Sequence, residues 1–235
     1  MISIIGNGNV ASHLKKALED KTEVMMINPH TLANIPDESE IIIICVSDKA
    51  ISEVAGKLSY SDKIVVHTSG SVPMDILKAT TSNIGVFYPL QTFSKGLEMN
   101  YDDIPVFIEA SNPDTKERLK KLAALITEDI READSETRKK LHLASVFACN
   151  FTNALARISE DLLKDSGLDF STLLPLMRQT VKKLEKLSPS QAQTGPAVRK
   201  DKGIISTHLQ MLENKPEIKR LYHDITNLIY EKSKI

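Results

Sequence analysis

The chain has 235 residues, a length that fits one large domain or two domains of ordinary size. Its 30 Lys and Arg residues are balanced by 31 Asp and Glu residues, without a long run of one sign, which disfavours nucleic acid and acidic membranes as partners. The longest purely apolar run, residues 41–46, is too short to cross a bilayer, and the N-terminus does not resemble a secretory signal. We therefore expect a cytoplasmic protein without a membrane segment, whose partner is a small molecule.

The two cysteines bear on the redox compartment. Cys45 and Cys149 lie in apolar sequence and lack the spacing of metal ligands. Both are expected to be buried thiols in a reducing cytoplasm, and no metal site is expected.

The first half of the chain alternates short β-branched runs with helical patterns. Strands are expected at residues 1–5, 23–27, 41–46, 63–67, 83–88 and 104–109. Helices are expected at residues 10–19, 50–58, 74–79 and 113–127. Continuous apolar strands are typical of a sheet covered on both faces. The alternation therefore predicts a doubly wound α/β domain with a mostly parallel sheet.

From about residue 134 the sequence pattern changes to helices alone. Apolar residues recur at helical spacing from residue 135 to Gly167, a natural left-handed cap, which predicts one long helix. Further helices are expected at residues 174–187, 204–212 and 217–233, and one long irregular loop at residues 188–203. We therefore expect a sheet domain over residues 1–133 and an all-helical domain over residues 134–235.

A glycine turn joins the first strand to the first helix. The segment GNGNVA matches the dinucleotide-binding fingerprint, with alanine at the third small position. Gly6 would allow the tight turn, Gly8 would let the backbone approach a pyrophosphate, and Ala11 would let the helix pack closely on the strand. The cofactor-binding residues expected here are Gly6, Asn7, Gly8, Asn9, Val10 and Ala11. The alternative is a plain strand-to-helix turn.

The end of the second strand bears on the choice of nucleotide. A NAD site commonly carries an acidic residue there, whereas this chain has Asn28, Pro29, His30 and Thr31. A carboxylate would repel a 2′-phosphate, while Asn28, His30 and Thr31 can donate hydrogen bonds to it. This favours NADP, and NAD stays possible because no arginine is present. The alternative is that Asn28 and Pro29 only form a turn.

Other strand ends carry polar residues that could meet a ligand. In open parallel sheets, ligands bind beyond the carboxyl ends of the strands. Val46 and Ser47 are expected to contact the cofactor, although Ser47 could equally cap the next helix. Ser69 is a catalytic candidate and Gln91 a substrate-binding candidate.

The long helix carries polar residues at offsets that place them roughly on one stripe. These residues are His142, Asn150, Asn153 and Arg157. His142 could give a proton to a carbonyl or imine that receives hydride, with Asn150 as a second catalytic candidate and Asn153 as a substrate contact. The alternative for His142 is a histidine held by a main-chain carbonyl between domains. In the loop after the helix, Arg199 could bind a substrate carboxylate in bidentate fashion, or lie on the surface without a ligand.

These segments together resemble a bacterial family of uncharacterised Rossmann-like oxidoreductases with a C-terminal helical domain of unknown function. The resemblance is carried by GNGNVASHL, VSDKAI, VVHTSGSVPMDIL, GVFYPLQTFS, LHLASVFACNFTN and AQTGPAVRKD. More distantly, the layout is similar to pyrroline-5-carboxylate reductase, deazaflavin-dependent NADP reductases and β-hydroxyacid dehydrogenases, with a helical domain like that of 6-phosphogluconate dehydrogenase. The resemblance implies a reductase fold that often dimerises through its helices. β-Hydroxyacid dehydrogenases carry a catalytic lysine one turn before the helix asparagine, where this chain has Val146.

The leading hypothesis is therefore an NADP-dependent oxidoreductase that reduces a small carboxylate-bearing carbonyl or imine. Residues 1–133 would hold the dinucleotide, and residues 134–235 would bind substrate and form a homodimer, because three helices in one chain leave apolar surface to cover. The alternative is a dinucleotide-binding sensor or scaffold protein without efficient catalysis.

Overall fold

The computed structural model describes residues 1–232, apart from the side chain of Ala33. It divides into two compact units, the first ending at Asn150 and the second beginning at Phe151. Each unit is described separately. The sequence placed the boundary at residue 133, before helix α4 (Ser135–Ser145), whereas the structure groups α4 with the first unit. The physical reason is that Arg138 of α4 is buried against the sheet.

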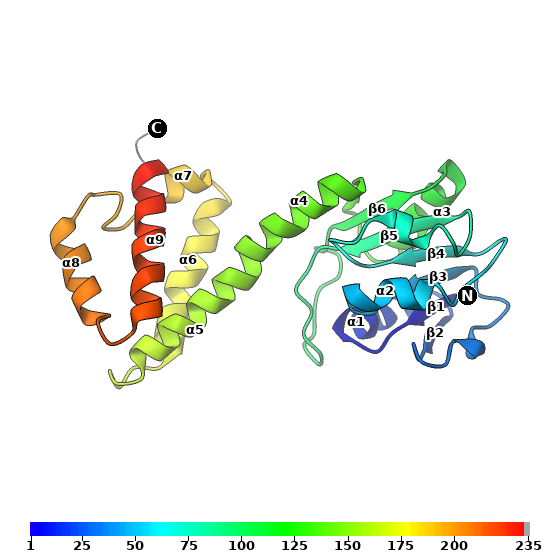
Figure 1. The fold of residues 1–235 in the computed structure, drawn as a ribbon, viewed down its shortest axis with the longest axis horizontal. Helices are drawn as coiled ribbons and strands as arrows, with labels where there is room; N and C mark the ends of the chain where they lie inside the picture. The colour runs from blue at the N-terminus through cyan, green and yellow to red at the C-terminus, as the bar shows by residue number, and fades with distance from the viewer. Residues whose placement is uncertain (233–235) are drawn as a thin grey trace. The chain divides into compact units, whose positions relative to one another are not determined.

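The first unit is built on one seven-stranded sheet in the order β2-β1-β3-β4-β5-β6-β7 (Figure 1). Its strands are β1 (Ile2–Ile5), β2 (Val24–Ile27), β3 (Ile41–Ile44), β4 (Ile64–His67), β5 (Ile84–Pro89), β6 (Val106–Ala110) and β7 (Ile130–Glu132). Every neighbouring pair is parallel except β5 and β6. The predicted doubly wound α/β fold is confirmed as Rossmann-like.

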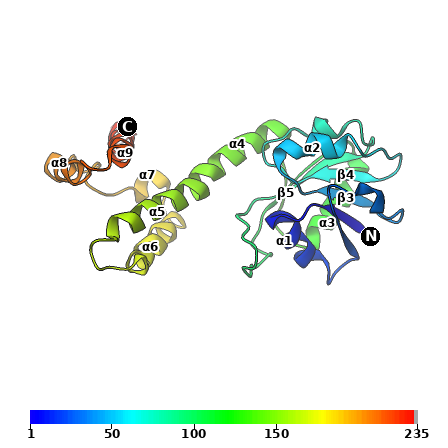
Figure 2. The same ribbon diagram turned by 60° about the horizontal axis from the view of Figure 1, so that its bottom comes forward.

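Helices cover both faces of this sheet. Leu14 and Leu18 of α1 (Asn9–Leu18) and Leu119 of α3 (Pro113–Ala124) pack on one face. Ile51 and Val54 of α2 (Asp48–Ala55) pack on the other. Figure 2 shows α1 and α3 on the side of the sheet opposite α2. The strands between them are therefore apolar on both faces, as their unbroken isoleucine and valine runs indicated.

The strand order creates a switch point beside β1. The chain leaves β1 for β2 on one side and reaches β3 on the other, so the carboxyl ends of β1 and β3 lie next to each other. The glycine turn begins at Gly6, directly after β1, and Val46 and Ser47 follow β3. In open α/β sheets, ligands bind in the crevice at such a point.

Several predicted elements needed correction. Residues 74–79 form only a short 3-10 turn, Met74–Leu77, because Pro73 and Thr80 confine the segment. The strand β7 was missed, since its three residues include Arg131 and Glu132 and carry no apolar run. The long helix contains a π-helical stretch, Val146–Phe151, between α4 and α5 (Thr152–Leu163).

The second unit is wholly helical over its described residues. After α5 come a 3-10 turn (Phe170–Leu173), α6 (Leu174–Leu184), α7 (Pro189–Ala192), α8 (Lys202–Met211) and α9 (Pro216–Lys232). The stretch predicted as one irregular loop contains α7, because Ser188 and Gln191 form a capping box and Pro189 begins the helix between them. The predicted end of the last helix at Ser233 lies outside the described residues. Within residues 1–232, no helix is both long and apolar enough to span a membrane.

Candidate dinucleotide site and its neighbours

The turn after β1 requires glycine at its first position. Gly6 has φ +139°, a conformation that L side chains rarely adopt. A Cβ atom at Gly6 would lie 2.3 Å from the carbonyl oxygen of Cys45, in the segment that follows β3. Gly6 therefore allows the turn after β1, and it also lets the ends of β1 and β3 approach each other.

The second glycine leaves the start of α1 open. Gly8 is the N-cap of α1, and a Cβ atom there would meet no described atom within 4 Å. The first turn of α1 contains no acidic residue, so its backbone N–H groups and the positive end of the helix dipole can receive an anion. Ala11 is fully buried, as close packing of this helix on the sheet requires. This geometry fits the pyrophosphate of a dinucleotide.

A cavity of about 270 Å³ extends from this turn across the switch point. Its lining joins three chain segments predicted to hold the cofactor: Gly6, Asn7 and Gly8; Pro29 and His30; Cys45, Val46 and Ser47, with Ala50, Glu53 and Val54 of α2. Asn28 and Thr31 are not among the lining residues. The Asn28 Oδ1 accepts a hydrogen bond from the His30 backbone N–H at 2.9 Å, so Asn28 forms the turn that presents His30.

Charges in this cavity are mixed. Glu53 forms an ion pair with Lys57, with 2.6 Å between Nζ and Oε1. Hydrogen bonding and charge from Lys57, with a smaller contribution from His30, lower the pKa of the Glu53 carboxyl. The absence of an acidic residue after β2 is visible in the sequence, whereas this carboxylate on α2 was not predicted. A 2′-phosphate bound beside His30 would therefore also lie near the negative charge of Glu53.

Asn9 is not among the residues that line this cavity. Its Nδ2 donates to the backbone oxygen of Phe93 at 2.9 Å, and the ring of His13, one turn later, lies 2.9 Å from both the Ser94 oxygen and the Tyr101 hydroxyl. Asn9 and His13 thus attach the segment after β5 to α1. Gln91 lies in that segment, is exposed, and accepts a hydrogen bond from the Thr92 N–H.

The loop after β4 is held by its own side chains. The Ser69 Oγ accepts hydrogen bonds from the backbone N–H groups of Ser71 and Val72 at 3.1 and 3.0 Å. The Ser69 N–H donates in turn to Nδ1 of His67 at 3.1 Å. Burial, and next the charge of Arg138, lower the pKa of His67 to about 4, so this acceptor nitrogen is unprotonated at neutral pH. Ser69 supports the loop, and its catalytic role stays a prediction.

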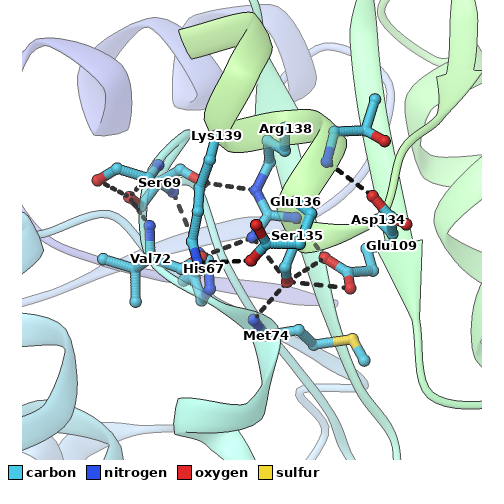
Figure 3. Close-up of polar contacts among 12 residues, drawn as sticks. His67, Ser69, Val72, Met74, Glu109, Asp134, Ser135, Glu136, Arg138 and Lys139 are labelled. Carbon is cyan, nitrogen blue, oxygen red and sulfur yellow. Dashed lines mark hydrogen bonds and ion pairs between the residues drawn. The ribbon is translucent and has the colours of Figure 1, made fainter. Parts of the chain in front are cut away.

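Arg138 of α4 fixes the same loop from the other side (Figure 3). It is 1 % exposed, and it donates from Nε to the Ser69 oxygen at 3.1 Å and from Nη2 to the Val72 oxygen at 2.6 Å. Its Nη1 forms an ion pair with Glu109 of β6, and Ser135 also donates to Glu109. Arg138 was not predicted from the sequence. The available signal was its position one helical turn before His142.

His142 lies against this loop as well. Its Nδ1 is 3.3 Å from the Tyr88 hydroxyl oxygen, and a Cβ atom on Gly70 would lie 2.8 Å from the same nitrogen. Burial raises the pKa of Tyr88, and a hydrogen bond with Ser145 partly opposes that shift. The structure thus brings His142 together with the loop of Ser69, and adds Tyr88.

The other candidates on the helices were predicted to share one stripe with His142, which stays a prediction. That stripe assumed a regular α-helix, and the π-helical stretch changes the angular spacing of the residues beyond it. Asn150 and Asn153 are both exposed, so water can satisfy their amides within this chain. Cys149 is only half-buried, whereas Cys45 is buried. Arg199 belongs to the second unit, where it is exposed in a turn that includes Lys200 at φ +57°.

Comparisons with known proteins support the fold and the family. Residues 104–229 match the model of a domain of unknown function, DUF2520. The crystal structure of a "putative NADP oxidoreductase" from Bacteroides fragilis is 38% identical, with a TM-score of 0.91, covering 98% of this chain and 97% of that one. Protein TM1727 from Thermotoga maritima is 26% identical, with a TM-score of 0.74 and coverage of 100% and 98%.

A more distant likeness concerns the fold alone. Plasmodium falciparum pyrroline carboxylate reductase with NADP bound is 14% identical, with a TM-score of 0.59, covering 99% of this chain and 97% of that one. No curated protein matches this chain. The family model spans more than half of the sequence, and the resemblance to Rossmann-like oxidoreductases with a helical C-terminal domain is confirmed. The chain therefore belongs to the DUF2520 family.

Proposed function

We propose that this chain is an NADP-dependent oxidoreductase that binds its dinucleotide over residues 6–11. The observation that carries the proposal is the open start of α1 at Gly8, which lies at the switch point of the sheet and lines a cavity with His30 and Ser47. Two similar proteins add support, because one is described as a putative NADP oxidoreductase and another was solved with NADP bound.

The substrate proposed is a small carbonyl or imine that carries a carboxylate. When bound, the cofactor supplies a hydride. The chain must then provide a proton and bind the carboxylate. His142 supplies a proton-carrying side chain beside the Ser69 loop, and Arg199 supplies an exposed guanidinium able to bind a carboxylate in bidentate fashion. Ser69, Gln91, Asn150 and Asn153 remain proposed site residues.

One experiment separates an oxidoreductase from a dinucleotide-binding protein without catalysis. The full chain, saturated with NADPH, is mixed with a library of oxo acids and cyclic imino acids, and the absorbance of NADPH is followed. Oxidation above the enzyme-free rate supports the proposal. Tight NADPH binding without oxidation of any member would support the sensor or scaffold alternative.

The preference for NADP is tested at His30. Titration of wild-type protein should give a lower Kd for NADPH than for NADH. Replacing His30 by Asp places a carboxylate where the 2′-phosphate would lie, and it should weaken NADPH binding at least tenfold while leaving NADH binding within about threefold. Equal affinities of the wild type for both dinucleotides would contradict the preference.

We also propose that the chain forms a homodimer through the second unit. Among residues 151–232, only Ala197 and Leu212 are buried, while large apolar side chains such as Leu155, Leu221 and Leu228 are exposed. An apolar cavity of about 260 Å³ opens between α5 and α9 in the same unit. Exposed apolar surface of this extent is typical of an interface, and a second copy would cover it with an identical surface.

A further inference from the structure

Tyr88 and His142 bring two proton-carrying groups together at the carboxyl edge of the sheet. The Tyr88 oxygen lies 3.3 Å from Nδ1 of His142, and the rings meet edge to face with centroids 6.3 Å apart. Tyr88 is near the end of β5, beside β4, whose following loop carries Ser69 and Gly70. Both rings are half-buried, so each keeps some exposed surface. The pair thus lies at the edge where open α/β sheets bind their ligands.

The position of the pair is fixed by its surroundings. A Cβ atom on Gly70 would lie 2.8 Å from both the His142 Nδ1 and the Tyr88 Cζ, so only glycine allows the loop to come this close. One turn before His142, Arg138 binds the Ser69 and Val72 carbonyl oxygens of the same loop, as Figure 3 shows. Strand, loop and helix therefore hold the two polar groups in one geometry. Such preorganisation is what proton transfer in a catalytic step requires.

The protonation state of Tyr88 suits a donor. Burial raises the pKa of its hydroxyl, with Ser145 and Arg138 opposing the shift to a smaller degree. The phenol consequently carries its proton at neutral pH.

Resting on the oxidoreductase function proposed above, we propose that Tyr88 is the proton donor of the reduction and that His142 returns the proton to it. A hydride from the reduced nicotinamide adds to the carbonyl or imine carbon, and the π electron pair moves to the oxygen or nitrogen. That atom takes the phenol proton of Tyr88. The resulting phenolate takes a proton from the His142 ring, and the ring regains a proton from solvent. The substrate gains a hydride and a proton, and the dinucleotide is oxidised.

The test replaces one hydroxyl at a time. Tyr88→Phe keeps the ring and removes the proton, so kcat should fall about 100-fold or more, the usual size of a general-acid contribution. The Kd for NADPH, measured by titration, should stay within about twofold, which excludes loss of the fold. Tyr222→Phe is the matched control, because the Tyr222 hydroxyl lies 2.8 Å from His208 Nδ1 in an edge-to-face pair in the second unit. It should keep at least half of the wild-type kcat.

A double variant tests the connection between the two groups. His142→Gln in the wild-type background should lower kcat. In the Tyr88→Phe background, the same substitution should lower kcat by less than about threefold, because both substitutions break the same relay. A Tyr88→Phe variant that keeps at least half of the wild-type kcat would overturn the relay while leaving the oxidoreductase function intact. Failure of the wild type to oxidise NADPH with any library member would overturn the proposed function itself, and the relay with it.

Discussion

At the scale of single residues, the two glycines of the turn after β1 have different tasks. Gly6 has a positive φ and is in close approach to the Cys45 carbonyl oxygen, whereas Gly8 has an ordinary φ of -77° and faces open space. Gly6→Ala should therefore lower the free energy of unfolding by about 1–3 kcal/mol or more through backbone strain and overlap. Gly8→Ala should leave it within about 1 kcal/mol. Urea denaturation of both variants checks this, and equal losses would contradict the assignment.

His67 should make stability depend on pH. Its folded pKa of about 4 lies below the ordinary value of 6.5, so the unfolded chain binds more protons between these two pH values. Stability contributed by neutral His67 is fully present above about pH 6.5 and is lost as pH falls towards 4, by about 3 kcal/mol at most. His67→Asn, which keeps a side-chain acceptor, should flatten this part of the profile. Identical slopes in the wild type and the variant, measured by denaturation at several pH values, would refute the role of His67.

At the scale of elements, sequence patterns predicted the strands and the turn that depend on neighbouring residues in the chain. The strands β1, β3 and β4 followed from unbroken apolar runs, and the glycine turn followed from the spacing of three small residues, Gly6, Gly8 and Ala11. The short strand β7 lacks such a run and is formed by pairing with β6. Tyr88, Arg138 and Glu109 were missed because their partners come from distant segments, and no spacing along the chain indicates that these side chains meet.

The attachment of α4 depends on such a distant contact. Arg138→Met removes a guanidinium that is 1 % exposed and leaves the Glu109 carboxylate without its ion-pair partner. Loss of one member of a buried pair costs about 3–5 kcal/mol, towards the lower end here because Glu109 is partly exposed. The matched control is Arg131→Met, since Arg131 pairs with Asp129 on the surface and its loss should hardly matter. Similar thermal stability of the two variants would contradict the anchoring role of Arg138.

At the scale of the whole molecule, only Ala197 and Leu212 are buried among residues 151–232, and a single chain does not explain the exposure of the other apolar side chains. A homodimer would bury the exposed leucines of α5 and α9, so light scattering at micromolar concentration should give twice the mass of one chain. Leu228→Asp, in α9, should shift the equilibrium towards monomer, and Leu97→Asp, in the first unit, should not. A wild-type mass equal to one chain at that concentration would contradict the proposed dimer.

The central claim is that a dinucleotide binds across the start of α1. Titration calorimetry of NADPH into wild-type protein and into Gly8→Val tests it most directly, because valine fits the backbone at residue 8 but fills the open space that the pyrophosphate would occupy. We expect the wild type to bind one NADPH per chain and Gly8→Val to bind at least tenfold more weakly, with an unchanged melting temperature. Wild-type affinity in a folded Gly8→Val variant would contradict the claim.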